Sequence, residues 1–329
     1  MRRRVSEWGM NLLAILIALG LEQWHAFRWR AAAERAFVVY ARGLERKLNG
    51  GTAAQGTVAA ALALIPPVAL ASLVWWVADS VHPLLGVVWN AAVLYLLMGF
   101  RRFSHAVSAI VQSLSDGDVT TARRALAGWR GGWTGELASE DVARLSIERG
   151  LFDAYRQVFA VLFWFIVLPG PMGAVLYRAA VLLADEWRGT APGDDLTPIA
   201  RSRAEFGKPA HGLLALLDWI PVRLTALSFA IVGDFEDAAY CWRMQAKTWP
   251  DAEGGESIGI ILASGAGALG VQLGGPLRSV GGEPQFRPEL GTGEPASPEM
   301  LPSAVGLVWR ALVLWLLLIL LITLANWAP

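Results

Sequence analysis

Two acidic side chains, Glu148 and Asp153, stand where a charged stretch of the sequence gives way to an apolar one. Carboxylate oxygens are the ligands that Mg²⁺ prefers, so this pair can hold a metal ion beside a phosphate. The alternative, which we favour, is a solvated helix end on which they pair with Arg149 or Arg156. The pattern leaves both a chemical and a structural interpretation open.

A second pair of charges, Asp218 and Arg223, lies inside the apolar segment 212–233. Charged side chains within a membrane segment cost several kcal/mol, typically about 3, so they face a protein interior or a polar cavity. Five residues apart they lie on different faces of a regular helix, but Pro221 disrupts the turn between them and can let them meet. We favour an ion pair, or Asp218 as a cap at a helix break, over contact with a polar ligand.

The glycines at 265, 267 and 270 have the Gly-x-Gly-x-x-Gly spacing of a dinucleotide-binding loop. That loop needs a strand before it and a helix after it, within alternating strands and helices. The sequence Gly-Gly-Pro at 274–276 interrupts any such helix soon after Gly270. We therefore expect the small residues to let one helix lie close against another.

The composition is that of a membrane protein, with 55% hydrophobic and 17% charged residues, against about 25% charged in a soluble domain. The net charge of zero offers no basic face for nucleic acid. Cys241 is the only cysteine, which excludes an intrachain disulfide and a cysteine-based metal cluster. The four histidines, at 25, 82, 105 and 211, lack metal-ligand spacing, so the metal stays unknown.

Apolar segments predict the elements that must position these residues. Residues 10–21 suggest an uncleaved anchor that is short for a span. Segments 57–78, bent at Pro66-Pro67, and 83–100 form a helical hairpin, and 212–233 and 304–325 are further spans. Segment 158–183 is split at 169–171 into halves too short to cross alone, as a broken helix or a re-entrant pair. Residues 185–211 and 281–302 are predicted loops.

Arginines gather on both sides of the hairpin, in 28–47 and 101–156, which places both flanks on the cytoplasmic side. The predicted fold is therefore all-α: a polytopic integral membrane protein with about four or five membrane-embedded helical elements. A cytoplasmic helical insertion lies at about 101–157, within a single membrane domain that covers 1–329.

The segment GALGVQLGGP (267–276) closely resembles the glycine segment near the carboxy end of the CobD/CbiB family, the membrane-bound adenosylcobinamide-phosphate synthases of cobalamin biosynthesis. The resemblance is colinear over most of the chain, and its further motifs are GDVTTARRAL (117–126), AVLFW (160–164), IPVRLTAL (220–227) and the closing VWRALVLWLLL (308–318). It implies a bacterial protein that lies within the lipid bilayer of the inner (cytoplasmic) membrane. The implied substrate is a corrinoid, and no nucleic acid is bound. The protein can act alone or as a homo- or hetero-oligomer.

The family condenses the carboxyl of adenosylcobyric acid with aminopropanol or its phosphate. The resemblance implies catalytic roles for Glu148, Asp153 and Asp185, the nearest acidic remnants of the family's polar motifs. It implies substrate-binding roles for Arg101, Arg102, Asp218, Arg223, Gly267, Gly270, Gly274 and Gly275. Mg²⁺ and ATP are implied cofactors if the amide-ligase activity is retained.

Two stretches depart from the family pattern and leave the enzymatic activity open. Residues 151–161, LFDAYRQVFAV, keep only Asp153 of an Asn-x-x-Asp-Gly motif, and 180–189 keep only an acidic residue near Asp185. The middle of the chain also looks like AmpE, so the alternative function is a non-catalytic inner-membrane sensor or scaffold. The glycine segment, which AmpE-type chains lack, favours the first interpretation.

Overall fold

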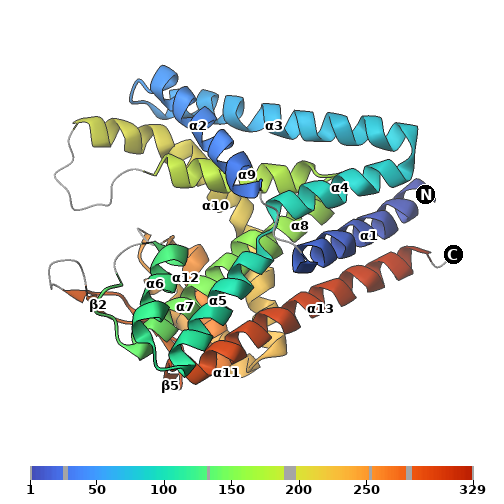
Figure 1. Cartoon of the computed structure of the whole chain (residues 1–329). Helices are drawn as coiled ribbons and strands as arrows, with labels where there is room; N and C mark the ends of the chain where they lie inside the picture. The colour runs from blue at the N-terminus through green and yellow to red at the C-terminus, as the bar shows by residue number, and fades with distance from the viewer. Residues whose placement is uncertain are drawn as a thin grey trace. The chain divides into compact units, whose positions relative to one another are not determined.

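The computed structural model describes residues 2–24, 29–131, 134–188, 198–251, 254–278 and 284–327. For residues 2–8, 100–103, 198–200, 278, 284–285 and 326–327 it describes the backbone only. The chain divides into two compact units. Unit 1 comprises 1–98, 160–219 and 319–329, and unit 2 comprises 99–159 and 220–318. Helices dominate both units, which confirms the all-α prediction (Figure 1).

Unit 1 is built from apolar helices around a hairpin. Its helices are α1 (Arg2–Trp24), α2 (Arg30–Leu48), α3 (Ala53–Val81), α4 (Pro83–Leu97), α8 (Ala160–Val167), α9 (Met172–Glu186), the first part of α10 (Pro198–Val232) and the end of α13 (Leu301–Trp327). The hairpin of α3 and α4 is as predicted, because His82 accepts a hydrogen bond from Leu84 N (3.2 Å) and Pro83 starts the second helix. Helix α3 continues through Pro66 and Pro67.

The break at Pro169-Gly-Pro171 is also confirmed, since α8 ends at Val167 and α9 begins at Met172. The prediction that each half is too short to cross is wrong for the first half. Helix α7 (Ser139–Ala154) runs through a π-helical turn, η1 (Tyr155–Phe159), into α8, and the continuous helix Ser139–Val167 contains an apolar window long enough to cross a membrane. Its charged residues suggested a soluble segment ending near 157, but several of them are buried.

The predicted polar loop at 185–211 is wrong over most of its described length. Helix α9 extends to Glu186, and α10 begins at Pro198, so that residues 198–211 are helical. Charged side chains there pair within the helix, as Lys208 does with Glu205 at 2.6 Å. A polar composition therefore marked an exposed helical end and not a loop.

Unit 2 combines helices with short strands. Its helices are α5 (Phe100–Ser115), α6 (Val119–Arg130), α7 with η1, the end of α10, α11 (Phe235–Gln245), η2 (Ala246–Thr248), α12 (Gly255–Leu269), η4 (Pro298–Met300) and most of α13. Strand β1 (Val271–Gly274) pairs antiparallel with β4 (Glu289–Leu290) and parallel with β5 (Glu294–Pro295). Strands β2 (Leu277–Arg278) and β3 (Pro284–Gln285) form a second pair. The predicted loop 281–302 thus carries strands that hold the end of the glycine segment.

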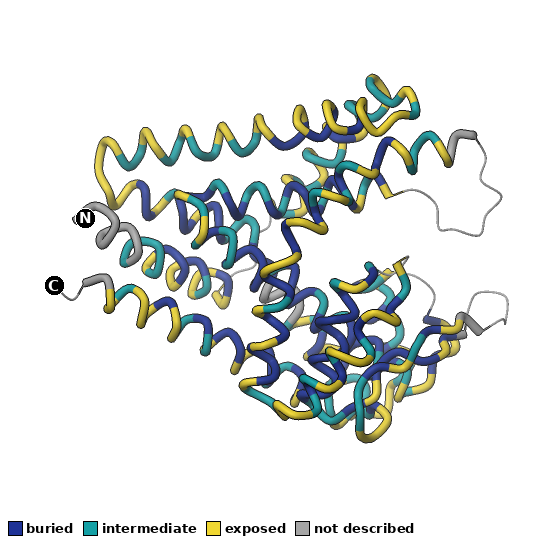
Figure 2. The backbone as a smooth tube through the Cα atoms, turned by 180° about the vertical axis from the view of Figure 1, so that it is seen from behind, coloured by how far each residue is buried: buried dark blue, intermediate teal, exposed yellow. Residues whose placement is uncertain are grey.

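Four helical stretches are long and apolar enough to cross a membrane: Ala53–Val81, Ser139–Val167, Arg201–Val232 and Pro298–Ala325. They differ in burial, because 28% of the apolar window of α3 is buried and 67% of that of α7–α8. Figure 2 shows exposed residues along much of α3. The exposed side chains of this helix include the large apolar residues Ile65, Leu70 and Trp76. An exposed apolar helix of this length suits contact with lipid, and the protein is a multi-pass membrane protein.

Candidate functional site

The glycine segment begins inside a helix. Gly265 and Gly267 belong to α12, and a side chain on Gly267 would collide with the backbone of α11, its Cβ lying 2.6 Å from Asp237 C. Gly270 ends the helix with a φ of +65°, a conformation that favours glycine. The order is helix, turn, strand, the reverse of a dinucleotide-binding loop, so the glycines serve close packing and a turn.

The end of the segment is held by a buried carboxylate. Gly274 and Gly275 have φ values of +73° and +72°, and Gly274 lies directly against the carbonyl of Pro288. The Gly274 N–H donates to Glu148 Oε1 at 2.8 Å. Glu148, on α7, therefore fixes the strand that follows the helix.

Glu148 also forms a buried ion pair with Arg287. Arg287 Nη1 lies 2.8 Å from Glu148 Oε2, and Nη2 lies 3.1 Å from Oε1, with 1% and 8% of the two side chains exposed. Arg287 also donates to the carbonyls of Gly274 and Gly275, both at 3.3 Å, and stands over the Trp249 ring. Both oxygens of Glu148 are thus engaged. Sequence reasoning missed Arg287, which lies in the segment assigned as a loop.

Asp153 is buried one turn and a half further along. Its Oδ1 lies 3.2 Å from Arg149 Nη2, and its Oδ2 accepts a hydrogen bond from Trp129 Nε1 at 2.8 Å. The expected pairing with Arg149 is confirmed, but the expected solvated helix end is wrong, since 3% of Asp153 is exposed. Glu148 and Asp153 face different partners within unit 2. The π-helical turn after them carries the buried Arg156, and such turns are frequent at functional sites.

The remaining predicted residues lie apart from this cluster in the sequence. Asp185, on α9, is about half exposed and lies 3.4 Å from Arg188. Asp218 is buried on α10 and accepts a hydrogen bond from Tyr177 at 2.8 Å. Arg223 lies on the same helix and is partly exposed, and no helix break separates the two at Pro221. The side chains of Arg101 and Arg102 lie outside the described residues.

A cleft that we call the arginine-lined cleft opens in unit 1 between α2, the end of α9 and the start of α10. It has a volume of about 830 Å³ and is lined by Arg42, Glu45, Arg46, Asn49, Glu186, Ser202 and Arg203. Arg42 pairs with Glu186 at 2.6 Å, which raises the pKa of the Arg42 guanidinium through their hydrogen bond, and Arg203 pairs with Glu45 at 2.8 Å. Arg46 is exposed, so the cleft presents positive charge to an anion.

Metal ligands are not gathered in the part of the chain that the structure describes. No group of three or more histidine, cysteine or acidic side chains there can hold an ion. His25 lies outside the described residues.

The fold and these sites define a multi-pass α-helical membrane protein with a buried charged cluster in one unit and an arginine-lined cleft in the other. Residues 13–308 match the model of the family described as "CobD/Cbib protein", and the chain belongs to this family. No solved structure matches the chain.

The relatives match along most of their length. The cobalamin biosynthesis protein CobD of Stutzerimonas stutzeri (strain A1501) is 35% identical over 94% of this chain and 96% of its own. The CobD of Chromobacterium violaceum is 36% identical over 89% of this chain and 88% of its own. The cobalamin biosynthesis protein CbiB of Salmonella arizonae is 27% identical over 73% of each.

Proposed function

We propose that the protein acts in cobalamin biosynthesis, in the amide-forming attachment of aminopropanol or its phosphate to adenosylcobyric acid. The observation that carries this proposal is the match to the CobD/CbiB family over residues 13–308, with relatives named for cobalamin biosynthesis. The match runs through the glycine segment, which an AmpE-like sensor or scaffold would lack. The AmpE-like alternative is therefore not favoured.

The arginine-lined cleft of unit 1 is the site we assign to an anionic part of the substrates. Its volume, about 830 Å³, lies within the range of ligand pockets. Three arginines and two glutamates line it, which leaves an excess of positive charge. Guanidinium groups bind phosphate and carboxylate through paired hydrogen bonds, and Arg46 is exposed to do so.

The three proposed catalytic carboxylates differ in what they can do. Both oxygens of Glu148 and of Asp153 already have protein partners, so neither offers a vacant position to a metal ion. Asp185 is about half exposed, and its Oδ1 lies 3.4 Å from Arg188 Nη2. The described residues thus bring no three such ligands together around a magnesium ion. We infer that Glu148 and Asp153 position the fold, whereas Asp185 is accessible to a substrate.

The location we propose is the bacterial inner membrane, with the part of the helical insertion that precedes the span Ser139–Val167 on the cytoplasmic side. The support is the arginine content of the segments that flank the α3–α4 hairpin. Cysteine labelling in a Cys241→Ser background tests it: a cysteine in place of Ser115 should react only with reagents that enter the cytoplasm.

Growth complementation tests the function. A bacterial strain that lacks its own CobD and needs cobalamin should grow on cobyric acid when it carries this gene, whereas the empty vector should grow only on cobinamide, the product side of the step. Arg46→Glu should weaken the rescue, and Arg35→Glu, an exposed change on the same helix outside the cleft, should not. Failure of the intact, membrane-inserted protein to support growth on cobyric acid would refute the proposed function.

A further inference from the structure

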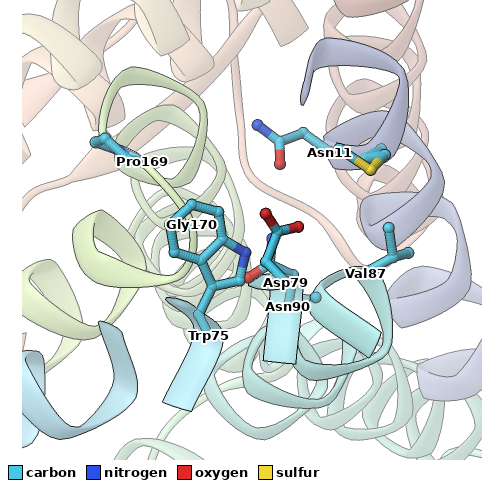
Figure 3. A pocket seen from close by; sticks show the side chains of 9 residues that line it. Asn11, Trp75, Asp79, Val87, Asn90, Pro169 and Gly170 are labelled. Carbon is cyan, nitrogen blue, oxygen red and sulfur yellow. The ribbon is translucent and has the colours of Figure 1, made fainter. Parts of the chain in front are cut away.

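A small pocket lies within unit 1, where α1, the α3–α4 hairpin and the break between α8 and α9 come together (Figure 3). Its volume is about 40 Å³, more than the roughly 10–15 Å³ that one water molecule needs. Polar side chains enter it from three helices: Asn11 from α1, Asp79 from α3 and Asn90 from α4. The pocket shares no lining residue with the arginine-lined cleft.

Asn90 brings an unpaired acceptor to this pocket. The residue is 3% exposed, and its Oδ1 has no hydrogen-bond partner among the described residues. A buried acceptor without a partner destabilises the fold, and nearly all such groups in native proteins are satisfied. The pocket that Asn90 lines can hold the missing donor or ion.

Asp79 brings a negative charge to the same space. It lies near the end of the apolar stretch Ala53–Val81, and an ionisable residue inside such a stretch marks a functional site. Gly86 on α4 leaves room for it, because a Cβ there would lie 2.8 Å from Asp79 Oδ1. Figure 3 shows the Asn11 amide and the Asp79 carboxylate facing one another across the pocket.

The wall opposite these groups is closed by packing. The Trp75 ring stands against Gly170, where φ is +57° and a Cβ would lie 2.5 Å from Trp75 Cδ2. None of the described residues that line the pocket carries a positive charge. The pocket is therefore small, rich in oxygen acceptors and negatively charged by one carboxylate.

We propose that this pocket binds a small monovalent cation between the Asp79 carboxylate, Asn90 Oδ1 and the Asn11 amide. One carboxylate and neutral amide oxygens suit a single positive charge, whereas protein sites for divalent cations collect more charged ligands. The cation can be an inorganic ion or the ammonium group of a small amine, because each carries a single positive charge. The pocket uses none of the residues assigned to the proposed biosynthetic function, so a thermal response to cations tests this site separately from that function.

Thermal unfolding of the purified full-length chain in detergent tests the proposal. Tm is measured against NaCl, KCl, NH₄Cl and ethanolammonium chloride, with N-methylglucamine chloride keeping the ionic strength constant. The site predicts a saturable rise in Tm for at least one small cation. A rise with Na⁺ or K⁺ identifies an inorganic ion, and a rise confined to the ammonium compounds identifies an amine.

Two variants and a control locate the effect. Asp79→Asn should weaken the apparent affinity at least tenfold. Asn90→Leu should abolish the response yet leave Tm in N-methylglucamine equal to or above that of the wild type, because it removes the unpaired acceptor. Glu205→Gln, an exposed carboxylate elsewhere in unit 1, should respond as the wild type does. No saturable rise in the wild type, or an unchanged rise in both pocket variants, would overturn the proposal.

Discussion

The buried pair of Glu148 and Arg287 should be a large contributor to the stability of unit 2. Replacing Arg287 by Met removes two charged hydrogen bonds, at 2.8 and 3.1 Å, and leaves a buried carboxylate with only the Gly274 N–H. Breaking one partner of a buried ion pair costs about 3–5 kcal/mol. With an unfolding entropy of about 2.1 cal/mol/K per residue over 329 residues, that corresponds to a fall in Tm of roughly 4–7 °C. Glu148→Gln should destabilise by a similar amount, since it removes the carboxylate charge that faces the buried guanidinium.

A double-mutant cycle separates this structural role from a catalytic one. Thermal unfolding in detergent of Arg287→Met, Glu148→Gln and the double variant should show that the double variant loses less than the sum, with a coupling of about 2–3 kcal/mol. The exposed pair Glu205–Lys208 is the matched control, and Lys208→Met should cost under about 1 kcal/mol. Wild-type Tm for Glu148→Gln together with lost complementation would refute the reasoning and make Glu148 a catalytic residue.

Three further predictions follow from particular contacts. Gly267→Ala should lower Tm more than Gly270→Ala. The methyl group added at 267 collides with backbone, whereas the methyl group at 270 has open space and costs only the strain of a positive φ. Equal shifts in Tm would contradict the packing role. Hydrogen bonds from Thr121 hold the pKa of the Asp118 carboxyl below its usual range, so Asp118 stabilises α6 above about pH 4, and this is lost as the pH falls through the lowered pKa. Amide hydrogen exchange in α6 should therefore be faster in Asp118→Ala than in the wild type at pH 7. A difference in exchange rate that persists at pH 2 would contradict a stabilising role for the ionised carboxylate. Burial raises the pKa of the Cys241 thiol, so maleimide should modify it slowly at pH 7 in the folded protein and rapidly after unfolding in SDS; rapid labelling of the folded protein would contradict its burial.

Hydrophobic runs predicted the α3–α4 hairpin, the break at 169–171 and the last span, because each is a local property of the sequence. Charge was the less reliable guide. Glu148 and Asp153 were predicted to lie at a solvated helix end, yet both are buried in a continuous helix. Glu148 pairs with the distant Arg287, and Asp153 pairs with the neighbouring Arg149. Polar residues at 198–211 read as a loop, yet they form helix α10, because salt bridges and exposed helical faces have the same composition as loops.

The site was predicted least well where it depends on contacts between distant residues. Arg287 stands 139 residues from Glu148, in a stretch rich in glycine and proline, and no local pattern links the two. Asn11, Asp79 and Asn90 are single polar residues in or beside apolar segments, which was a signal that sequence reasoning passed over. Gly267, in contrast, packs against the backbone of α11, as its small size predicted, and Gly270 ends the helix in a turn. The substrate-binding roles that the resemblance implies for both glycines stay predictions.

Direct detection of the product tests the central claim. The purified protein in liposomes is incubated with adenosylcobyric acid, aminopropanol phosphate, ATP and Mg²⁺, and the corrinoids are analysed by mass spectrometry. We expect a new corrinoid whose mass equals the sum of the two substrates less one water, and this product should be absent without the amine. Unchanged adenosylcobyric acid, with protein that is folded and oriented in the membrane, would contradict the assignment to the amide-forming step.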